Sequence, residues 1–277
     1  MPLPTSQATI GPFFPRTFFR EGDNDLRRDL KARHLNMIAI GGAIGTGLFL
    51  ASAGSIKDAG PGGALVAYAV IGFMVWLLMQ SLGEMSTYLP LANSFEAYGT
   101  RFASPSFGFA QGWNYWINWA VTVAAEIAAA GIIVSYWWPD VDQRLVAMVF
   151  FAVLFTINAV SVKAFGESEF LFSSIKVLTV LVFLVVGVLM IFGIMTDAPG
   201  TKNWTTGDAP FVGGFTGLIS IFMIAGFSFQ GTEMIGVAAG EADEPEKTIP
   251  KAIRAVFFRI LLFYVGAFIV IGFLLPY

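Results

Sequence analysis

The stretch IAIGGAIGTGLFLASAG, residues 38–54, is apolar enough to cross a membrane as a helix, yet it contains five glycines. Four of them fall within the seven residues from Gly41 to Gly47. A helix in lipid must satisfy its own backbone hydrogen bonds, and glycine loosens a helix. Irregular backbone at membrane depth is tolerated only against protein or a cavity, so the stretch predicts a helix that comes apart beside a cavity.

The composition of the 277-residue chain is typical of a membrane protein. The chain is 56% hydrophobic and 13% charged, and its mean hydropathy is +0.71. Soluble domains carry about twice that charged fraction. There is no cysteine, and the one histidine, His34, precedes the first apolar run. Thiol catalysis and cysteine-based metal sites are therefore excluded. No nucleophile–base pair, metal cluster or phosphate-binding loop indicates an enzyme.

Seven apolar runs approach the roughly 20 residues that a membrane-spanning helix needs. We number them spans one to seven, and they predict an all-α multi-pass membrane protein. Residues 1–33 are expected to form an N-terminal tail, and residues 34–277 the transmembrane domain. The spans cover residues 35–56, 63–88, 107–138, 145–162, 170–195, 212–240 and 255–276.

Basic residues are divided unequally between the two alternating sets of loops. Cytoplasmic loops carry an excess of lysine and arginine, so this asymmetry predicts orientation. The richer set includes the N-terminal tail, which is therefore expected to be cytoplasmic. It holds eleven basic residues, namely Arg16, Arg20, Arg27, Arg28, Lys31, Arg33, Arg101, Lys163, Lys247, Lys251 and Arg254. The opposite set holds three, namely Lys57, Arg144 and Lys202.

Span six carries a second interruption, IAGFSFQGTE, residues 224–233, in which two glycines flank Ser228 and Gln230. Spans one and six are five apart, so they run in opposite directions. Glycine-interrupted helices at matching places in two oppositely oriented halves are the best sequence pointer to the substrate site of a transporter. Small residues four apart in span one also fit tight helix packing, which is the alternative. The matching interruption in span six favours the binding site.

The two interruptions suit the two charges of an α-amino acid. If span one unwinds at residues 44–47, the N–H groups of its restarted helix suit a carboxylate, and Thr46 adds a hydroxyl. If span six unwinds at residues 227–231, its free carbonyl groups suit an ammonium. Phe227 lies at this second break, where its ring could cover a bound substrate. A phenylalanine that faces lipid or the core is the alternative.

Ionisable residues inside membrane spans are costly and usually functional. Four candidates occur here: Glu84 near one end of span two, Glu126 in span three, Lys176 in span five, and Glu233 directly after the break in span six. Glu84 is expected to act as a structural cap or a gate. Glu126 is a candidate contact for a cationic substrate side chain, and Glu233 for binding or coupling. Lys176 is expected to exchange protons or to act as a fixed cation near the site. A structural ion pair is the alternative.

Six stretches between Leu26 and Tyr277 carry a dense resemblance to a known family. They are LRRDLKARHLNMIAIGGAIGTGLF, AGPGGALVAY, GFAQGWNYWINWAVT, SVKAFGESEFLFSSIKVLTV, GFSFQGTEMIGVAAGEADEP and IPKAIRAVFFRILLFY. These stretches resemble the amino acid–polyamine–organocation superfamily. Within it they are similar to the bacterial amino acid transporters, above all to lysine-specific permeases. Aromatic, histidine and proline permeases share several of the motifs.

The resemblance implies a LeuT-type fold of twelve spans in a five-plus-five inverted repeat, and proton-coupled import across the bacterial inner membrane. It implies that the backbone of Ala43, Ile44, Gly45, Thr46 and Gly47 holds the substrate carboxylate and part of its amine. Carbonyl groups from Ile224 to Gln230 would complete the amine site.

Side-chain roles also follow from the resemblance. Phe227 matches an aromatic gate, and Lys176 matches a lysine that occupies a sodium-like site. Glu233 and Glu241 match functional acids of lysine permeases. Glu126 stands where the lysine-permease pattern has aspartate.

The chain departs from the family pattern at both ends. It stops after span seven, so we expect a truncated product or a part of a longer protein. Residues 1–25 have no counterpart in the permeases and are expected to be a disordered tail. The segment SQATIGPFFP faintly resembles the start of intradiol dioxygenase subunits.

The function expected is a proton-driven importer of a cationic amino acid, most simply lysine, that works by alternating access. The expected partners are the substrate and the lipid bilayer, with a regulatory membrane protein as a further candidate. No nucleic acid, no metal and no cofactor other than the coupling proton are expected. One alternative is a permease for a neutral or aromatic amino acid. The other, from a different class, is a membrane sensor or regulatory partner that does not transport, or an inactive fragment.

Overall fold

The computed structural model describes residues 37, 41–42, 44–89, 91, 94–160, 162–237, 239 and 245–277. Within these residues all regular structure is helical, as the sequence predicts. The predicted tail at residues 1–33, including the unmatched segment 1–25, lies outside the described residues. The helices in chain order are α2 (Thr46–Phe49), α3 (Ala51–Tyr88), α4 (Ser94–Phe102), α5 (Pro105–Trp137), α6 (Gln143–Val160), α7 (Val162–Ile191), α8 (Lys202–Thr205), α9 (Gly214–Ser220), α10 (Phe222–Ser228), α11 (Met234–Val237), α12 (Pro245–Arg259), the π-helix η2 (Ile260–Val265) and α13 (Gly266–Leu274).

Spans one and two meet in a bend inside α3. Gly60 has φ 74° and ψ 169°, a backbone conformation that favours glycine, and Pro61 then starts the second part of the helix. The loop before α9 binds the N–H groups that this bend frees. The carbonyl oxygen of Pro210 accepts hydrogen bonds from the N–H groups of Gly62 at 2.9 Å and Gly63 at 3.2 Å.

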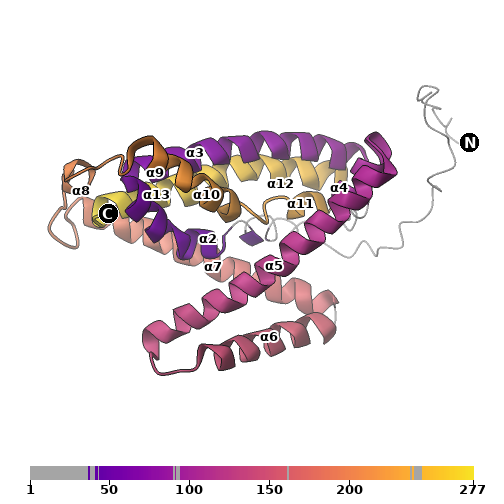
Figure 1. The fold of residues 1–277 in the computed structure, drawn as a ribbon, viewed down its shortest axis with the longest axis horizontal. Coiled ribbons are helices and arrows are strands. Elements are labelled where there is room, and N and C mark those ends of the chain that lie inside the picture. Colours follow the sequence, from indigo (N-terminus) through magenta and orange to yellow (C-terminus); the bar gives the residue numbers. More distant parts are fainter. Residues whose placement is uncertain are drawn as a thin grey trace, which may run out of the picture.

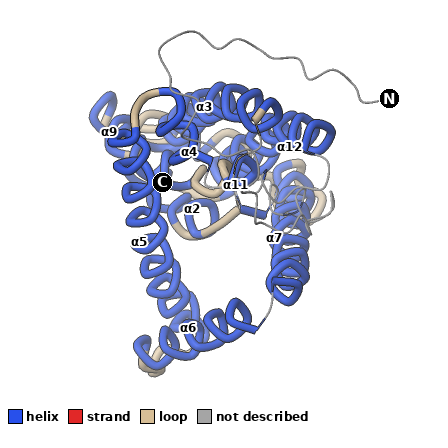
Figure 2. Tube along the Cα trace, turned by 90° about the vertical axis from the view of Figure 1, so that its right-hand side faces the viewer, coloured by secondary structure: helices blue, strands red, loops and turns tan. Residues whose placement is uncertain are grey.

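Two groups of helices enclose the broken ones. α3 runs beside α12, η2 and α13 (Figure 1). On the other side, α5, α6 and α7 form an open frame, and α2 and α11 lie between the two groups (Figure 2). Ser104 caps the N-terminus of α5, because its side chain accepts a hydrogen bond from the N–H of Phe107 at 3.2 Å. Pro105 occupies the first turn, where it suits a helix start.

The aromatic core lies where α3, η2 and α13 meet the break in span six. Tyr68 lies 4.1 Å from Phe268 and Phe229 lies 4.3 Å from Tyr264, measured between ring centroids. All four side chains are buried. In contrast, α5, α6 and α7 expose large apolar side chains along most of their length, as lipid-facing helices do.

Each of the seven predicted spans contains helix, but the bounds differ from the prediction. Two spans share α3, and the helix of span seven begins at Pro245 rather than at residue 255. Its first turns were missed because they are amphipathic, with Lys247 and Lys251 exposed. Three described stretches are long and apolar enough to cross a membrane: Ala51–Tyr88, Pro105–Trp137 and Glu167–Ile191. Three shorter apolar helices are Gln143–Ala159, Gly214–Ser228 and Leu262–Leu274.

Candidate functional site

Span one is broken where the glycine cluster predicts. Residues 41–42 are helical, and α2 begins only at Thr46. Between them Gly45 is extended, with φ −139° and ψ −159°, and no side chain caps the new helix. The N–H of Ile44 donates to the carbonyl of Gly41 at 3.0 Å. The predicted break is therefore confirmed at residues 44–45, whereas Thr46 and Gly47 already belong to α2. Ala43 lies outside the described residues.

Span six is broken as well. α10 ends at Ser228, and α11 starts at Met234. Irregular turns connect them, and within these Gly231 has a φ of 93°. The N–H of Gln230 donates to the carbonyl of Phe227 at 3.0 Å, a three-residue step that tightens the helix end. The predicted break at residues 227–231 is confirmed within one or two residues.

The two breaks touch, and glycine allows the contact. A Cβ on Gly47 would overlap the Cα of Ser228, and a Cβ on Gly42 would lie 2.9 Å from the carbonyl oxygen of Gly231. Gly45 differs, since the nearest atom to its Cβ position is a carboxylate oxygen of Glu126 at 3.6 Å. Packing and helix breaking therefore both account for the cluster, at different glycines.

Residues on one face of α5 form hydrogen bonds with residues at both breaks. Glu126 accepts a hydrogen bond from the hydroxyl of Thr46 at 2.6 Å. Thr122 lies one helical turn before Glu126, and its hydroxyl accepts a hydrogen bond from the side-chain amide of Gln230 at 2.9 Å. Tyr115 lies two turns before Thr122, and its hydroxyl donates to Glu233 at 3.4 Å.

Glu233 folds back onto the break that it follows. Its Oε2 accepts a hydrogen bond from the N–H of Gly231 at 2.8 Å, and its Oε1 accepts the one from Tyr115. The carboxylate thus stabilises the left-handed turn at Gly231 and ties it to α5.

Lys176 reaches the broken part of span one from α7. Its Nζ donates to the carbonyl oxygen of Gly41 at 3.1 Å, across 135 positions of sequence. A Cβ on Gly41 would overlap the hydroxyl of Ser173, one turn before Lys176, so the two helices are in close contact. Among the described residues Lys176 forms no ion pair with a carboxylate.

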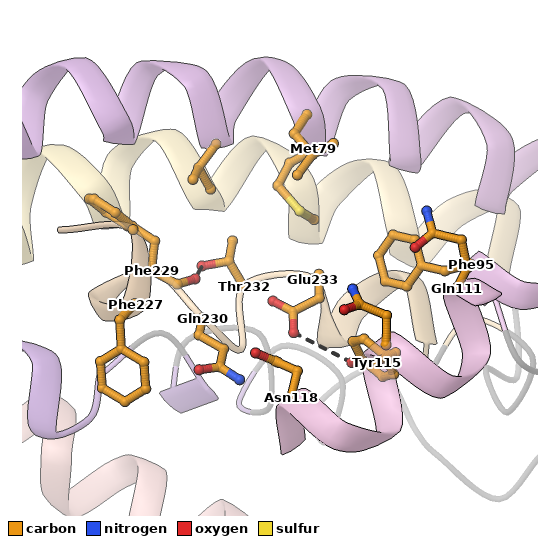
Figure 3. A pocket seen from close by; sticks show the side chains of 14 residues that line it. Met79, Phe95, Gln111, Tyr115, Asn118, Phe227, Phe229, Gln230, Thr232 and Glu233 are labelled. Carbon is orange, nitrogen blue, oxygen red and sulfur yellow. Dashed lines mark hydrogen bonds between the residues drawn. The ribbon is translucent and has the colours of Figure 1, made fainter. Parts of the chain in front are cut away.

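A cavity of about 560 Å³ lies beside the break in span six, between α3, α4 and α5. Phe227, Gln230 and Glu233 line it, as the close view shows (Figure 3). The predicted residues of span one and Glu126 do not line it. The wall from α5 consists of Gln111, Asn114, Tyr115 and Asn118.

Sequence reasoning missed this wall and Thr122. The available signal was polar side chains at residues 111, 115, 118, 122 and 126, spaced as on one helix face in an otherwise apolar run. The same segment is rich in tryptophan, which also fits anchoring at the membrane surface. Glu241, the other acid indicated by the resemblance, lies outside the described residues.

The sequence from residue 34 to residue 277 matches the amino acid permease family. The chain belongs to this family. Its helices and its family make it a multi-pass membrane protein, and the family is one of transporters rather than enzymes, as expected from the sequence.

Three relatives of this permease-family chain are informative. The lysine-specific permease LysP of Escherichia coli (strain K12) is 57% identical over 254 residues, which are 91% of this chain and 52% of LysP. LysP of Lactococcus lactis subsp. cremoris (strain MG1363) is 50% identical over 262 residues, covering 92% and 52%. The histidine permease HisP of the same strain is 50% identical over 254 residues, covering 91% and 53%. The chain therefore spans about half the length of these relatives.

Proposed function

We propose that the protein imports an amino acid across the bacterial cytoplasmic membrane, with its N-terminus in the cytoplasm. The observation that carries this proposal is the contact between two broken, apolar helices that lie far apart in sequence. Gly47 packs against Ser228, so the restarted α2 and the end of α10 meet. Such a junction offers N–H groups and carbonyl groups at one place in the membrane.

The substrate carboxylate binds at the start of α2, where the N–H groups of residues 45–47 have no side-chain cap. The substrate ammonium binds carbonyl groups at the end of α10. Phe227, which is 39% exposed at that end, covers the bound molecule. These three contacts recognise the part that all α-amino acids share.

The substrate side chain is cationic, and lysine is the first candidate. Glu126 lies beside the break of span one and adds a negative charge there, which favours a substrate with an additional ammonium group. The names of two relatives, both lysine permeases, agree with this choice. Histidine is the second candidate, because HisP is as similar as the second of the two lysine permeases.

Protons drive the import, and Lys176 couples them to the movement of span one. Its ammonium group binds the carbonyl of Gly41 directly before the break. Loss of the proton from Lys176 removes a charge-assisted hydrogen bond, so protonation biases the position of this segment.

Uptake of labelled lysine tests the function. The complete product of the reading frame is placed in vesicles with an inward proton gradient. We expect saturable accumulation that collapses when a protonophore is added. Absence of saturable uptake of any amino acid would contradict the proposal. A panel of unlabelled amino acids then decides the side chain, and competition by histidine but not by lysine would select the second candidate.

A further inference from the structure

A cluster of four polar residues lies under the break in span six, on the side away from α5. It consists of Ser55 and Tyr68 from α3, Ser228 at the end of α10, and Tyr264 from η2. All four are buried, with exposed fractions of 0%, 0%, 4% and 1%. Buried polar groups that bond one another specify a unique geometry.

Ser228 is bound at both of its polar groups. Its side-chain hydroxyl lies 2.9 Å from the hydroxyl of Tyr68, which in turn lies 3.4 Å from that of Ser55. Its backbone carbonyl accepts a hydrogen bond from the hydroxyl of Tyr264. The last residue of α10 is therefore held by α3 through its side chain and by η2 through its backbone.

Tyr264 owes its position to the π-helical turn. A π-helix is rare, occurs mostly as a single turn inside an α-helix, and frequently marks a functional site. In this turn the ring of Tyr264 lies 4.3 Å from Phe229 and 5.9 Å from Tyr68, between centroids. Packed rings on two sides fix the hydroxyl against the helix end.

The break is consequently held by two different elements, η2 and α5. η2 binds the carbonyl of Ser228, while Thr122 on α5 binds the side chain of Gln230 two residues later. The carbonyl of Ile224 accepts the hydroxyl of Ser228 at 2.8 Å. Side chains thus engage some carbonyl groups of this helix end and so determine the direction in which the others face.

We infer that Tyr264 is a positioning residue for the amine site. It acts through the carbonyl of Ser228 and sets the geometry in which the end of α10 presents its remaining carbonyl groups to the substrate ammonium. Tyr68 supports the same element through the hydroxyl of Ser228. This inference rests on the proposed function.

The test compares Tyr264→Phe, which removes one hydroxyl and keeps the ring, with Tyr136→Phe, which removes a hydroxyl from an exposed tyrosine at the outer end of α5. Uptake of L-lysine is measured in vesicles per folded transporter. 6-Aminohexanoate, which lacks only the α-amino group, is used as a competitor. For Tyr264→Phe we expect the KM for lysine to rise about three- to tenfold, the effect of one net hydrogen bond. The maximal rate and the inhibition constant of 6-aminohexanoate should not change.

A Ser228→Ala background separates the two tyrosines. It removes the hydroxyl that Tyr68 contacts and keeps the carbonyl that Tyr264 binds. There Tyr264→Phe should still raise the KM by the same factor, whereas Tyr68→Phe should have no further effect. If Tyr264→Phe has no effect in this background, the assignment to the carbonyl is wrong.

A purely structural role predicts a different result, namely a lower maximal rate with the KM and the discrimination against 6-aminohexanoate unchanged. That result would overturn the inference.

If Tyr264→Phe fails to accumulate in the membrane, 3-fluorotyrosine at position 264 keeps the hydroxyl and makes it a stronger donor. The KM should then fall, and an unchanged KM would count against the inference.

Failure of the proposed function is distinguishable from these outcomes, because the unmodified protein would then show no saturable uptake. If the competition panel identifies another amino acid, the same comparison uses that amino acid and its analogue without the α-amino group.

Discussion

At the scale of the residue, individual glycines in span one have different tasks. Gly47 allows the contact with Ser228, whereas Gly54, on the same side of the break, has no atom within 4 Å of its Cβ position. Gly47→Ala should therefore destabilise the folded protein by about 1–3 kcal/mol through overpacking and should reduce uptake. Gly54→Ala is the matched control and should be neutral or slightly stabilising. Thermal unfolding in detergent measures both, and equal unfolding temperatures would contradict the packing role of Gly47.

Glu126 is the residue on which the choice of a cationic substrate depends. Glu126→Gln keeps the size and an oxygen that can accept from Thr46, but removes the charge. We expect the KM for lysine to rise about tenfold or more, since hydrogen bonds to charged groups are the stronger ones. Competition by neutral amino acids should change little. A similar loss for cationic and neutral compounds would show that Glu126 supports the structure of the break rather than the substrate charge.

Residues that carry a charge inside an apolar run could be identified from the sequence, and three of them contact the breaks or lie directly after one. Their partners could not be identified. Tyr115 and Thr122 contact Glu233 and Gln230 across more than 100 positions, and only the tertiary fold brings these pairs together. Ser228 and Tyr264 are 36 positions apart, and they too are brought together only by the tertiary fold.

At the scale of the element, both helix breaks were predictable because glycine clusters in apolar runs have few physical explanations. The residues at which the helices begin, bend and end could be predicted less well. Hydropathy does not reveal the bend at Gly60, where two spans follow each other without a loop. Nor does it reveal the π-helical turn in span seven, since every residue of that turn is apolar or aromatic.

Lys176 links two elements, α7 and the broken span one, through its hydrogen bond to the carbonyl of Gly41. Lys176→Met keeps the length of the side chain and removes its charge. We expect gradient-driven accumulation of lysine to fall towards equilibrium, because the protonatable link to Gly41 is lost. Exchange of internal for external lysine should survive.

Lys57→Met is the control. It changes an exposed lysine in α3, directly after span one, and should accumulate lysine normally. If Lys176→Met loses exchange and accumulation equally, Lys176 holds the fold rather than coupling protons.

At the scale of the whole molecule, the division of basic residues between loops predicts the orientation in the membrane. These 277 residues contain no cysteine, so a single cysteine introduced among them has no competing thiol within this part. A cysteine in place of Lys202 should react with a membrane-impermeant thiol reagent in intact cells, and one in place of Lys251 only after permeabilisation. Both lysines are exposed. The reverse pattern would contradict the predicted orientation.

The proposed recognition joins three contacts: the two touching breaks bind the carboxylate and the α-amino group of an amino acid, and Glu126 binds a cationic side chain. Three competitors of lysine uptake test it directly, each lacking one group: cadaverine without the carboxylate, 6-aminohexanoate without the α-amino group, and norleucine without the terminal amine. The complete protein should bind each at least about tenfold more weakly than lysine, because the site then keeps unpaired polar groups. Competition by cadaverine or 6-aminohexanoate as strong as that of lysine would contradict the claim.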